Sequence, residues 1–139
     1  MAIKSEHGKI LRAFEGTVLV KEGSTGNWAY EIVSGKVEVS TLHKRRKMVL
    51  ARLGPKQWFG ELGLVSDAPR TASVVAASDC TLRVITRKTF DRLLRRNPKA
   101  LYPLLKSLFE RLREMNARYL MAIEYQLLSS ERRNAPDTQ

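Results

Sequence analysis

The chain has 139 residues and carries 25 Lys and Arg against 14 Asp and Glu, which gives a formal net charge of +11. At about 100 to 200 residues per domain, this length predicts a single domain, and the 43% hydrophobic content can fill its core, which excludes a large multidomain enzyme. No window approaches the ~18–20 consecutive apolar residues that span a bilayer, and residues 1–14 carry charges where a signal peptide needs an apolar run, so we expect a cytoplasmic protein without a membrane span.

The first two thirds of the chain are predicted to form short strands. Apolar residues alternate with polar ones in six runs, namely residues 17–20, 28–33, 36–41, 48–53, 71–76 and 81–86. Ser34-Gly35 is a tight-turn signal and predicts a hairpin between the second and third runs, and residues 44–47 are expected at the exposed tip between the third and fourth. Short strands at this spacing predict a closed or rolled antiparallel sheet, over about residues 15–86.

The pattern changes to a helical period at Thr86, a good N-cap residue. Residues 87–96 place Phe90, Leu93 and Leu94 at helical spacing and predict a short helix. Asn97-Pro98 is a second start signal, so a long helix is expected from there to about residue 128. The tail, residues 129–139, is polar, contains Pro136 and is expected to be disordered, which leaves residues 1–128 as the domain.

The long helix carries apolar residues in a heptad pattern. We call this set the heptad seam, and its members are Leu101, Leu105, Leu108, Leu112, Met115, Tyr119 and Ala122. The seam can pair with its copy in a homodimer or pack against the domain's own sheet. Apolar residues off the seam, such as Phe109 and Leu120, favour the homodimer, and the two arrangements are compatible.

The net charge lies in the second part of the chain. Residues 1–43 hold five basic and five acidic groups, so the whole excess falls in residues 44–139, chiefly at 44–47, at 87–99 and along the last helix. Such a distribution attracts anions, but it does not separate nucleic acid, acidic lipid, a phosphorylated small molecule and an acidic protein. A solvated basic surface is an equal alternative.

The sequence excludes cysteine- and histidine-based metal sites. Cys80 is the single cysteine and lies in an apolar-alternating run, which predicts a buried, inert thiol. His7 and His43 are the two histidines, too few for a multi-histidine site. No metal is therefore expected.

Residues 59–72 contain the candidate binding site. Gly60 lets the backbone approach a ligand, and residues 62–65 can form one helical turn whose first N–H groups attract an anion. Pro69 fixes the approach to Arg70, whose guanidinium can bond two phosphate oxygens at once. Glu61 would repel a bare phosphate but can accept a hydrogen bond from a sugar hydroxyl, so the pair suggests a nucleotide. An Arg70–Glu61 salt bridge on a loop is an equally weighted alternative.

The segments Phe59-Gly60-Glu61-Leu62-Gly63-Leu64 and Pro69-Arg70-Thr71-Ala72-Ser73-Val74 resemble the phosphate-binding cassette of the cyclic nucleotide-binding domain family. The family includes catabolite activator proteins and regulatory subunits of cyclic-AMP-dependent kinase. Glycine and strand residues upstream extend the resemblance over about residues 10–125, although Lys56 stands where many relatives have glycine. The resemblance implies an eight-stranded antiparallel β-roll, similar to a jelly roll, with flanking helices and a long C-terminal helix.

The resemblance also implies a role for each residue of the candidate site. Glu61 would hold the ribose 2′-hydroxyl and Arg70 the cyclic phosphate. The backbones of Gly60, Leu62 and Ala72 would make the remaining phosphate and ribose contacts, and Thr71 would line the pocket beside the base. In the long helix, Met115 and Asn116 would lie near the purine, with Asn116 bonding an adenine edge, although a solvent-facing position on the helix is the slightly favoured interpretation of Asn116.

The function expected from this resemblance is a non-catalytic sensor. Cyclic AMP is the preferred ligand on family habit, and cyclic GMP is the second choice because the Thr71 hydroxyl can contact a guanine amino group. The long helix would pass the signal to an unidentified protein partner. The sequence contains no helix-turn-helix DNA-binding domain and no poised base or metal set for catalysis. The alternative is a degenerate basic β-roll that acts as a scaffold for nucleic acid, acidic lipid or an acidic protein.

Overall fold

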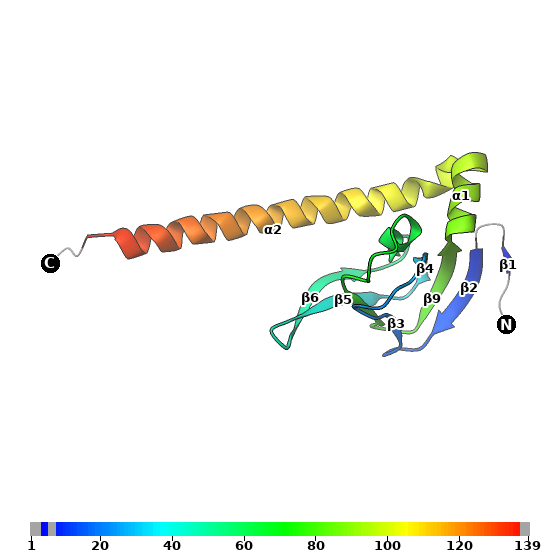
Figure 1. Cartoon of the computed structure of the whole chain (residues 1–139), viewed down its shortest axis with the longest axis horizontal. Helices are drawn as coiled ribbons and strands as arrows, with labels where there is room; N and C mark the ends of the chain where they lie inside the picture. The colour runs from blue at the N-terminus through cyan, green and yellow to red at the C-terminus, as the bar shows by residue number, and fades with distance from the viewer. Residues whose placement is uncertain (1–3, 6–7, 137–139) are drawn as a thin grey trace. The chain divides into compact units, whose positions relative to one another are not determined.

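The computed structural model describes residues 4–5 and 8–136. These residues divide into two compact units, one ending at Leu104 and the other beginning at Leu105. The first unit contains every strand of the described part of the chain together with a short α-helix (Figure 1). The second unit consists of a single helical segment.

The strands of the first unit form two antiparallel sheets. One has five strands in the order β1-β2-β9-β4-β7, and the other has four in the order β3-β8-β5-β6 (Figure 1). The bounds are β1 (Lys4–Ser5), β2 (Gly8–Ala13), β3 (Val18–Val20), β4 (Trp28–Ser34), β5 (Val37–His43), β6 (Arg46–Leu53), β7 (Trp58–Phe59), β8 (Ser73–Ala76) and β9 (Cys80–Thr86). The predicted eight-stranded β-roll is confirmed, and the two-residue β1 adds a ninth strand among the described residues.

The core lies between the two sheets. Ile32 and Leu82 of the first sheet and Val37 and Val74 of the second are all buried in one cluster. Tyr30 and Phe59 stack within it, with ring centroids 5.0 Å apart. Cys80 is buried in the same cluster, 4% exposed, as the sequence predicted for an inert thiol.

The predicted hairpin between residues 28–33 and 36–41 is wrong, because β4 and β5 belong to different sheets. Gly35 has a φ of 90°, and a Cβ placed there would lie 2.4 Å from the Asp79 carbonyl oxygen. The chain therefore turns against residues 77–80, where the Ala77 amide donates to the Lys36 carbonyl at 2.9 Å. This corner carries the backbone from one sheet into the other instead of closing a two-stranded ladder.

The expected tip at residues 44–47 is shorter in the structure. Lys44 and Arg45 form the turn, both with positive φ, and Arg46 already belongs to β6 and pairs with His43 of β5. Strand β2 was missed by the sequence analysis, which began the roll at about residue 15.

A one-turn helix and a short α-helix complete the first unit up to residue 97. η1 (Glu61–Leu64) follows β7, where a helical turn was predicted. α1 (Arg87–Arg96) starts as predicted, with the Thr86 side chain accepting from the Thr89 amide at 3.1 Å, and it buries Leu93 against the roll.

The long helix begins later than its start signal suggested. Asn97-Pro98 opens a 3-10 turn, η2 (Pro98–Leu101), and α2 (Tyr102–Asn134) follows it. Leu101 of the predicted heptad seam therefore lies in η2. Residues 129–134, expected in a disordered tail, are helical, and residues 137–139 lie outside the described residues. No helix in the described part of the chain is long and apolar enough to cross a membrane.

Candidate functional site

The segment between β7 and β8 begins with a left-handed glycine. Gly60 directly precedes η1 and has φ 73° and ψ 14°. Any residue with a side chain would be strained in this left-handed conformation. The Gly63 amide donates to the Gly60 carbonyl at 3.1 Å, and the Ser66 amide donates to the Leu62 carbonyl at 2.8 Å. Gly63 and Leu64 are buried, which holds the turn against the roll.

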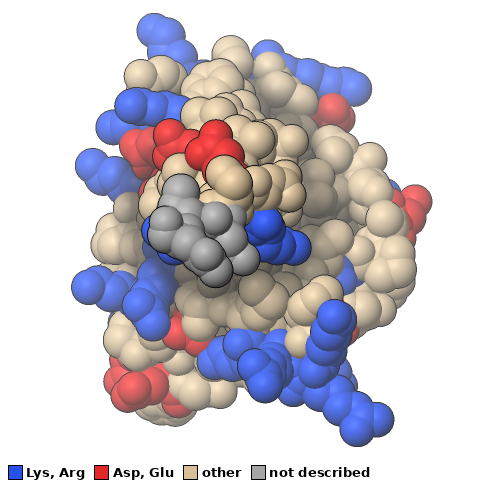
Figure 2. All heavy atoms as spheres, turned by 90° about the vertical axis from the view of Figure 1, so that its left-hand side faces the viewer, with Lys and Arg blue, Asp and Glu red and all other residues tan. Residues whose placement is uncertain are grey.

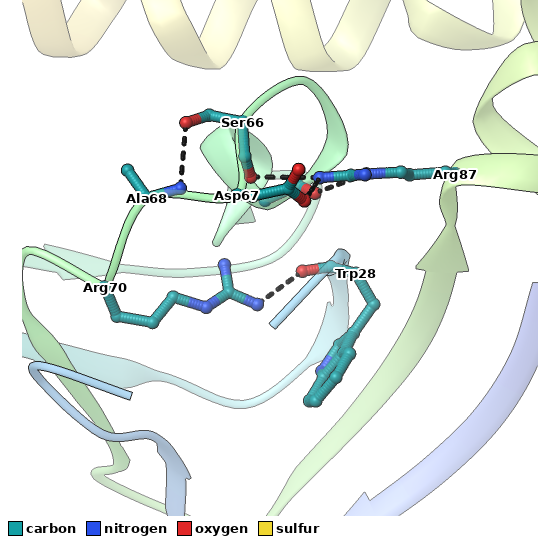
Figure 3. Close-up of polar contacts among 7 residues, drawn as sticks. Trp28, Ser66, Asp67, Ala68, Arg70 and Arg87 are labelled. Carbon is teal, nitrogen blue, oxygen red and sulfur yellow. Dashed lines mark hydrogen bonds and ion pairs between the residues drawn. The ribbon is translucent and has the colours of Figure 1, made fainter. Parts of the chain in front are cut away.

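Arg70 reaches back to the start of this turn. Its Nη1 donates to the Gly60 carbonyl at 2.8 Å. Its Nη2 donates to the Trp28 carbonyl at 2.7 Å, the bond drawn in Figure 3. The guanidinium carbon also lies 5.7 Å from the centroid of the Trp28 ring, within range of a cation–π interaction. Arg70 thus links β4 to the N-terminal end of η1.

Glycines leave the room that this guanidinium occupies. A Cβ on Gly26 would lie 2.7 Å from Arg70 Nη2, and a Cβ on Gly63 would lie 2.8 Å from Arg70 Nη1 and 2.6 Å from the Gly26 carbonyl oxygen. Side chains at these positions would displace the arginine or separate the two loops. Gly26 and Gly63 therefore allow the 21–27 loop, η1 and Arg70 to meet.

The 21–27 loop also fixes the backbone of Arg70. The Arg70 amide donates to the Ser24 carbonyl at 2.7 Å, and the Gly23 amide donates to the Arg70 carbonyl at 2.8 Å. The Glu22 amide donates to Ser73 Oγ at 2.9 Å, three residues further along the chain. Arg70 is therefore held at both its backbone and its side chain.

Glu22 ties the same loop to β5. Its carboxylate accepts from the Thr41 hydroxyl at 2.6 Å and from the Leu42 amide at 3.0 Å. These bonds, first the one from Thr41, lower the pKa of Glu22 below its ordinary value of 4.5.

The lowered pKa of Glu22 predicts that the stability of the fold depends on pH. Because the pKa of Glu22 is lower in the folded chain than in the unfolded one, its stabilising contribution is present above about pH 4.5 and is lost as the pH falls through the folded value. We expect the thermal midpoint of wild type to exceed that of Glu22→Gln at neutral pH, and the difference to shrink on acidification. A difference that stays constant from about pH 7 to pH 3 would contradict this.

The structure brings most of the predicted site residues together. Gly60, Glu61 and Leu62 lie at the start of η1, and Arg70 contacts Gly60 directly. Thr71 is exposed and Ala72 half-buried in the stretch that leads from Arg70 into β8. Asn116 is an exposed residue of α2 in the second unit, and its role in base recognition stays a prediction.

The sequence analysis missed three residues that shape this region. Trp28 supplies the carbonyl and the ring that contact Arg70, Gly26 allows the close approach, and Arg87 bonds the far end of η1. Trp28 and Gly26 carry no signal in the sequence, since their roles depend on a loop 40 residues away in the chain. Arg87 does carry a signal in the sequence, because it is a cation at the first position of a predicted helix, where the helix dipole disfavours positive charge.

The arrangement suits a ligand that carries an anionic group and, next to it, a hydroxyl group. A guanidinium has five N–H donors, and the carbonyls of Gly60 and Trp28 each accept from one of those of Arg70. The remaining donors can bind phosphate oxygens, and the half-buried Glu61 lies at the start of the same turn, where a carboxylate can accept from a sugar hydroxyl.

Comparison with known proteins gives a consistent result. Residues 12–97 match the model of the cyclic nucleotide-binding domain family. The chain is 35% identical to the cyclic AMP receptor protein of Thermus thermophilus over 118 residues, which are 84% of this chain and 52% of that protein. It is 36% identical over 95 residues to a cAMP-dependent protein kinase regulatory subunit of Pyricularia oryzae, covering 64% of this chain and 24% of the subunit.

The fold comparison agrees with the sequence comparison. The crystal structure of the Thermus thermophilus catabolite activator protein is similar at a TM-score of 0.68 and 33% identity, over 88% of this chain and 55% of that one. The chain thus spans about half the length of the bacterial relative and about a quarter of the kinase subunit.

Proposed function

Because the chain belongs to the cyclic nucleotide-binding domain family, we propose that it is a non-catalytic sensor that binds a cyclic nucleotide in the β-roll. The cyclic phosphate would lie on Arg70 and the start of η1, with the ribose 2′-hydroxyl on Glu61. The observation that carries this proposal is the position of Arg70, whose guanidinium lies among three glycines at the N-terminal end of η1.

The direct test is a titration of the wild-type chain with cyclic AMP and with cyclic GMP. Calorimetry and thermal shift measure the same event, since a ligand that binds the folded state raises the thermal midpoint. No heat and no shift with either nucleotide at millimolar concentration would remove the proposal. Adenosine monophosphate is the matched control, because it offers the same base and sugar with an open phosphate.

We propose cyclic AMP as the preferred ligand, with cyclic GMP as the alternative. The names of the two protein relatives support this choice, since one is a cyclic AMP receptor and the other a subunit of a cAMP-dependent kinase. Thr71 keeps cyclic GMP open, because its exposed hydroxyl could contact the guanine amino group. The ratio of the two dissociation constants decides between them.

The signal would leave the domain through α2, which we propose also forms a homodimer. Several apolar side chains of this helix are exposed, including the seam residues Leu105, Leu112, Met115 and Tyr119. Apolar surface of this extent favours association, because burying it removes it from water.

A charge on the heptad seam should separate such a dimer. We expect wild type to sediment as a dimer at micromolar concentration and Leu112→Lys to sediment as a monomer, with the β-roll still folded. Ala117→Lys, at an exposed position of the same helix on the side opposite the seam, is the matched control. A monomeric wild type, or a Leu112→Lys dimer as stable as wild type, contradicts the homodimer.

The alternative function, a basic scaffold, has one observation in its favour. Lys44, Arg45 and Arg46 are exposed and form no ion pair with any residue that the structure describes, whereas Lys47 pairs with Glu38. Figure 2 shows more lysine and arginine side chains than acidic ones at the surface in this view. A scaffold for an anionic partner would lose affinity steeply with salt and would not respond to replacement of Arg70.

A further inference from the structure

Arg87, the first residue of α1, bonds the end of η1 with three hydrogen bonds. Its Nε donates to the Gly63 carbonyl at 3.0 Å, and its Nη2 donates to the Ser66 carbonyl at 3.0 Å and to Asp67 Oδ1 at 2.6 Å. Figure 3 shows the Arg87 side chain extending from α1 to the loop that carries Ser66 and Asp67. One side chain therefore joins α1 to the segment that follows η1.

The carbonyls of Gly63 and Ser66, which accept from Arg87, lie where the helix itself offers no hydrogen-bond donor. The last carbonyls of a helix have no intrahelical donor, and Gly63 lies in the last turn of η1, while Ser66 follows its C-cap residue Val65. A guanidinium is a rigid planar fork whose donors have fixed relative directions, whereas the ammonium of lysine is a compact charge on a flexible stem. Arg87 thus fixes the position of this end of η1.

Arg87 stands where the helix itself disfavours a cation. The N-terminal end of a helix carries partial positive charge, so acidic residues are preferred in its first turn. The first turn of α1 has no acidic residue and holds both Arg87 and Lys88. The three hydrogen bonds to the η1 loop offset this unfavourable position.

Two arginines thus hold η1 from opposite ends. Arg70 bonds the Gly60 carbonyl before the turn, and Arg87 bonds the Gly63 carbonyl at its end. Their supports are adjacent, because Trp28, which accepts from Arg70, pairs across the sheet with Thr86, the residue before Arg87. An anion that binds the remaining donors of Arg70 would lie at the start of the turn, whereas the contacts of Arg87 lie at its other end.

We propose that Arg87 is a positioning residue that couples nucleotide binding at η1 to the first turns of α1. This inference rests on the proposed function. Coupling is reciprocal: if the Arg87 contacts hold η1 in the geometry that binds the nucleotide, the nucleotide must strengthen those contacts by the same factor. Nucleotide binding therefore stabilises the start of α1 through this side chain.

The test measures both directions of the coupling in the full chain. Calorimetry gives the dissociation constant for cyclic AMP, and hydrogen exchange with and without saturating cyclic AMP gives the protection of residues 90–94, whose amides make the first intrahelical bonds of α1. In wild type we expect cyclic AMP to raise this protection by about 10-fold. In Arg87→Gln we expect the dissociation constant to rise about 10-fold and the protection to respond little.

Three further variants define the cause. Arg95→Gln makes the same change on the same helix, where the arginine pairs with the exposed Asp91, and should behave as wild type. Asp67→Asn removes the charged acceptor and leaves the carbonyls, so its effect should be smaller than that of Arg87→Gln. Arg87→Lys keeps the charge without the fork and should lose most of the coupling.

The possible outcomes separate this inference from the proposed function. A wild type that binds neither cyclic AMP nor cyclic GMP removes both. A wild type that binds, with an Arg87→Gln variant of unchanged affinity or an unchanged protection response, overturns only the role of Arg87. An Arg87→Lys variant equal to wild type also overturns it, because charge alone would then suffice. A purely structural role would lower protection equally with and without nucleotide, which overturns the coupling as well.

Discussion

Replacing Arg70 with alanine is expected to weaken cyclic nucleotide binding by at least about 100-fold. Hydrogen bonds to charged groups contribute about 1.5–3 kcal/mol each, and a bidentate guanidinium–phosphate contact would make two of them. A loss of about 3 kcal/mol corresponds to a factor of about 100 in the dissociation constant. Calorimetric titration of Arg70→Ala and wild type with the same nucleotide measures the difference.

Arg70 also has structural contacts, and its variants need controls for them. The bonds to the Gly60 and Trp28 carbonyls are lost in Arg70→Ala, which should cost about 1–2 kcal/mol of unfolding free energy and lower the thermal midpoint without unfolding the domain. Arg92→Ala removes an exposed arginine of α1 and should change neither quantity. Arg70→Lys should recover only part of the affinity. A folded Arg70→Ala variant with the affinity of wild type would show that this arginine does not bind the phosphate.

Local patterns in the sequence predicted most of the elements near the site. The alternation at residues 81–86, the Thr86 cap and the helical spacing of Phe90 and Leu93 each depend on residues within one element, and β9 and α1 appear where expected. The turn after Gly60 is likewise local, since glycine is needed for its left-handed backbone. The positions of Arg70 and the η1 residues in one loop follow from their closeness in the chain.

The remaining features depend on contacts between segments that are far apart in the chain. The turn at Gly35 resembles a hairpin signal, but it packs against Asp79 and Cys80 and changes sheet there. Asn97-Pro98 is a helix start by local rules, yet it opens a 3-10 turn before α2. Trp28 became part of the site only because β4 lies beside the loop of Arg70, and no pattern within β4 predicts that neighbour.

The contact between Gly63 and the 21–27 loop leads to the second large effect. In Gly63→Ala the new methyl group would lie 2.6 Å from the Gly26 carbonyl oxygen and 2.8 Å from Arg70 Nη1, distances too short for any packed side chain. Overpacking of this kind costs about 1–3 kcal/mol, and relief requires η1 or Arg70 to move. We expect the unfolding free energy to fall by that amount and nucleotide affinity to fall by about 10-fold or more, because the phosphate donors would no longer converge.

Gly54→Ala is the matched control: a methyl group there would meet nothing within 4 Å, so stability should stay constant or rise by up to about 1 kcal/mol, with unchanged affinity. Equal stability and affinity in the two alanine variants would mean that close approach at Gly63 is not what shapes the site.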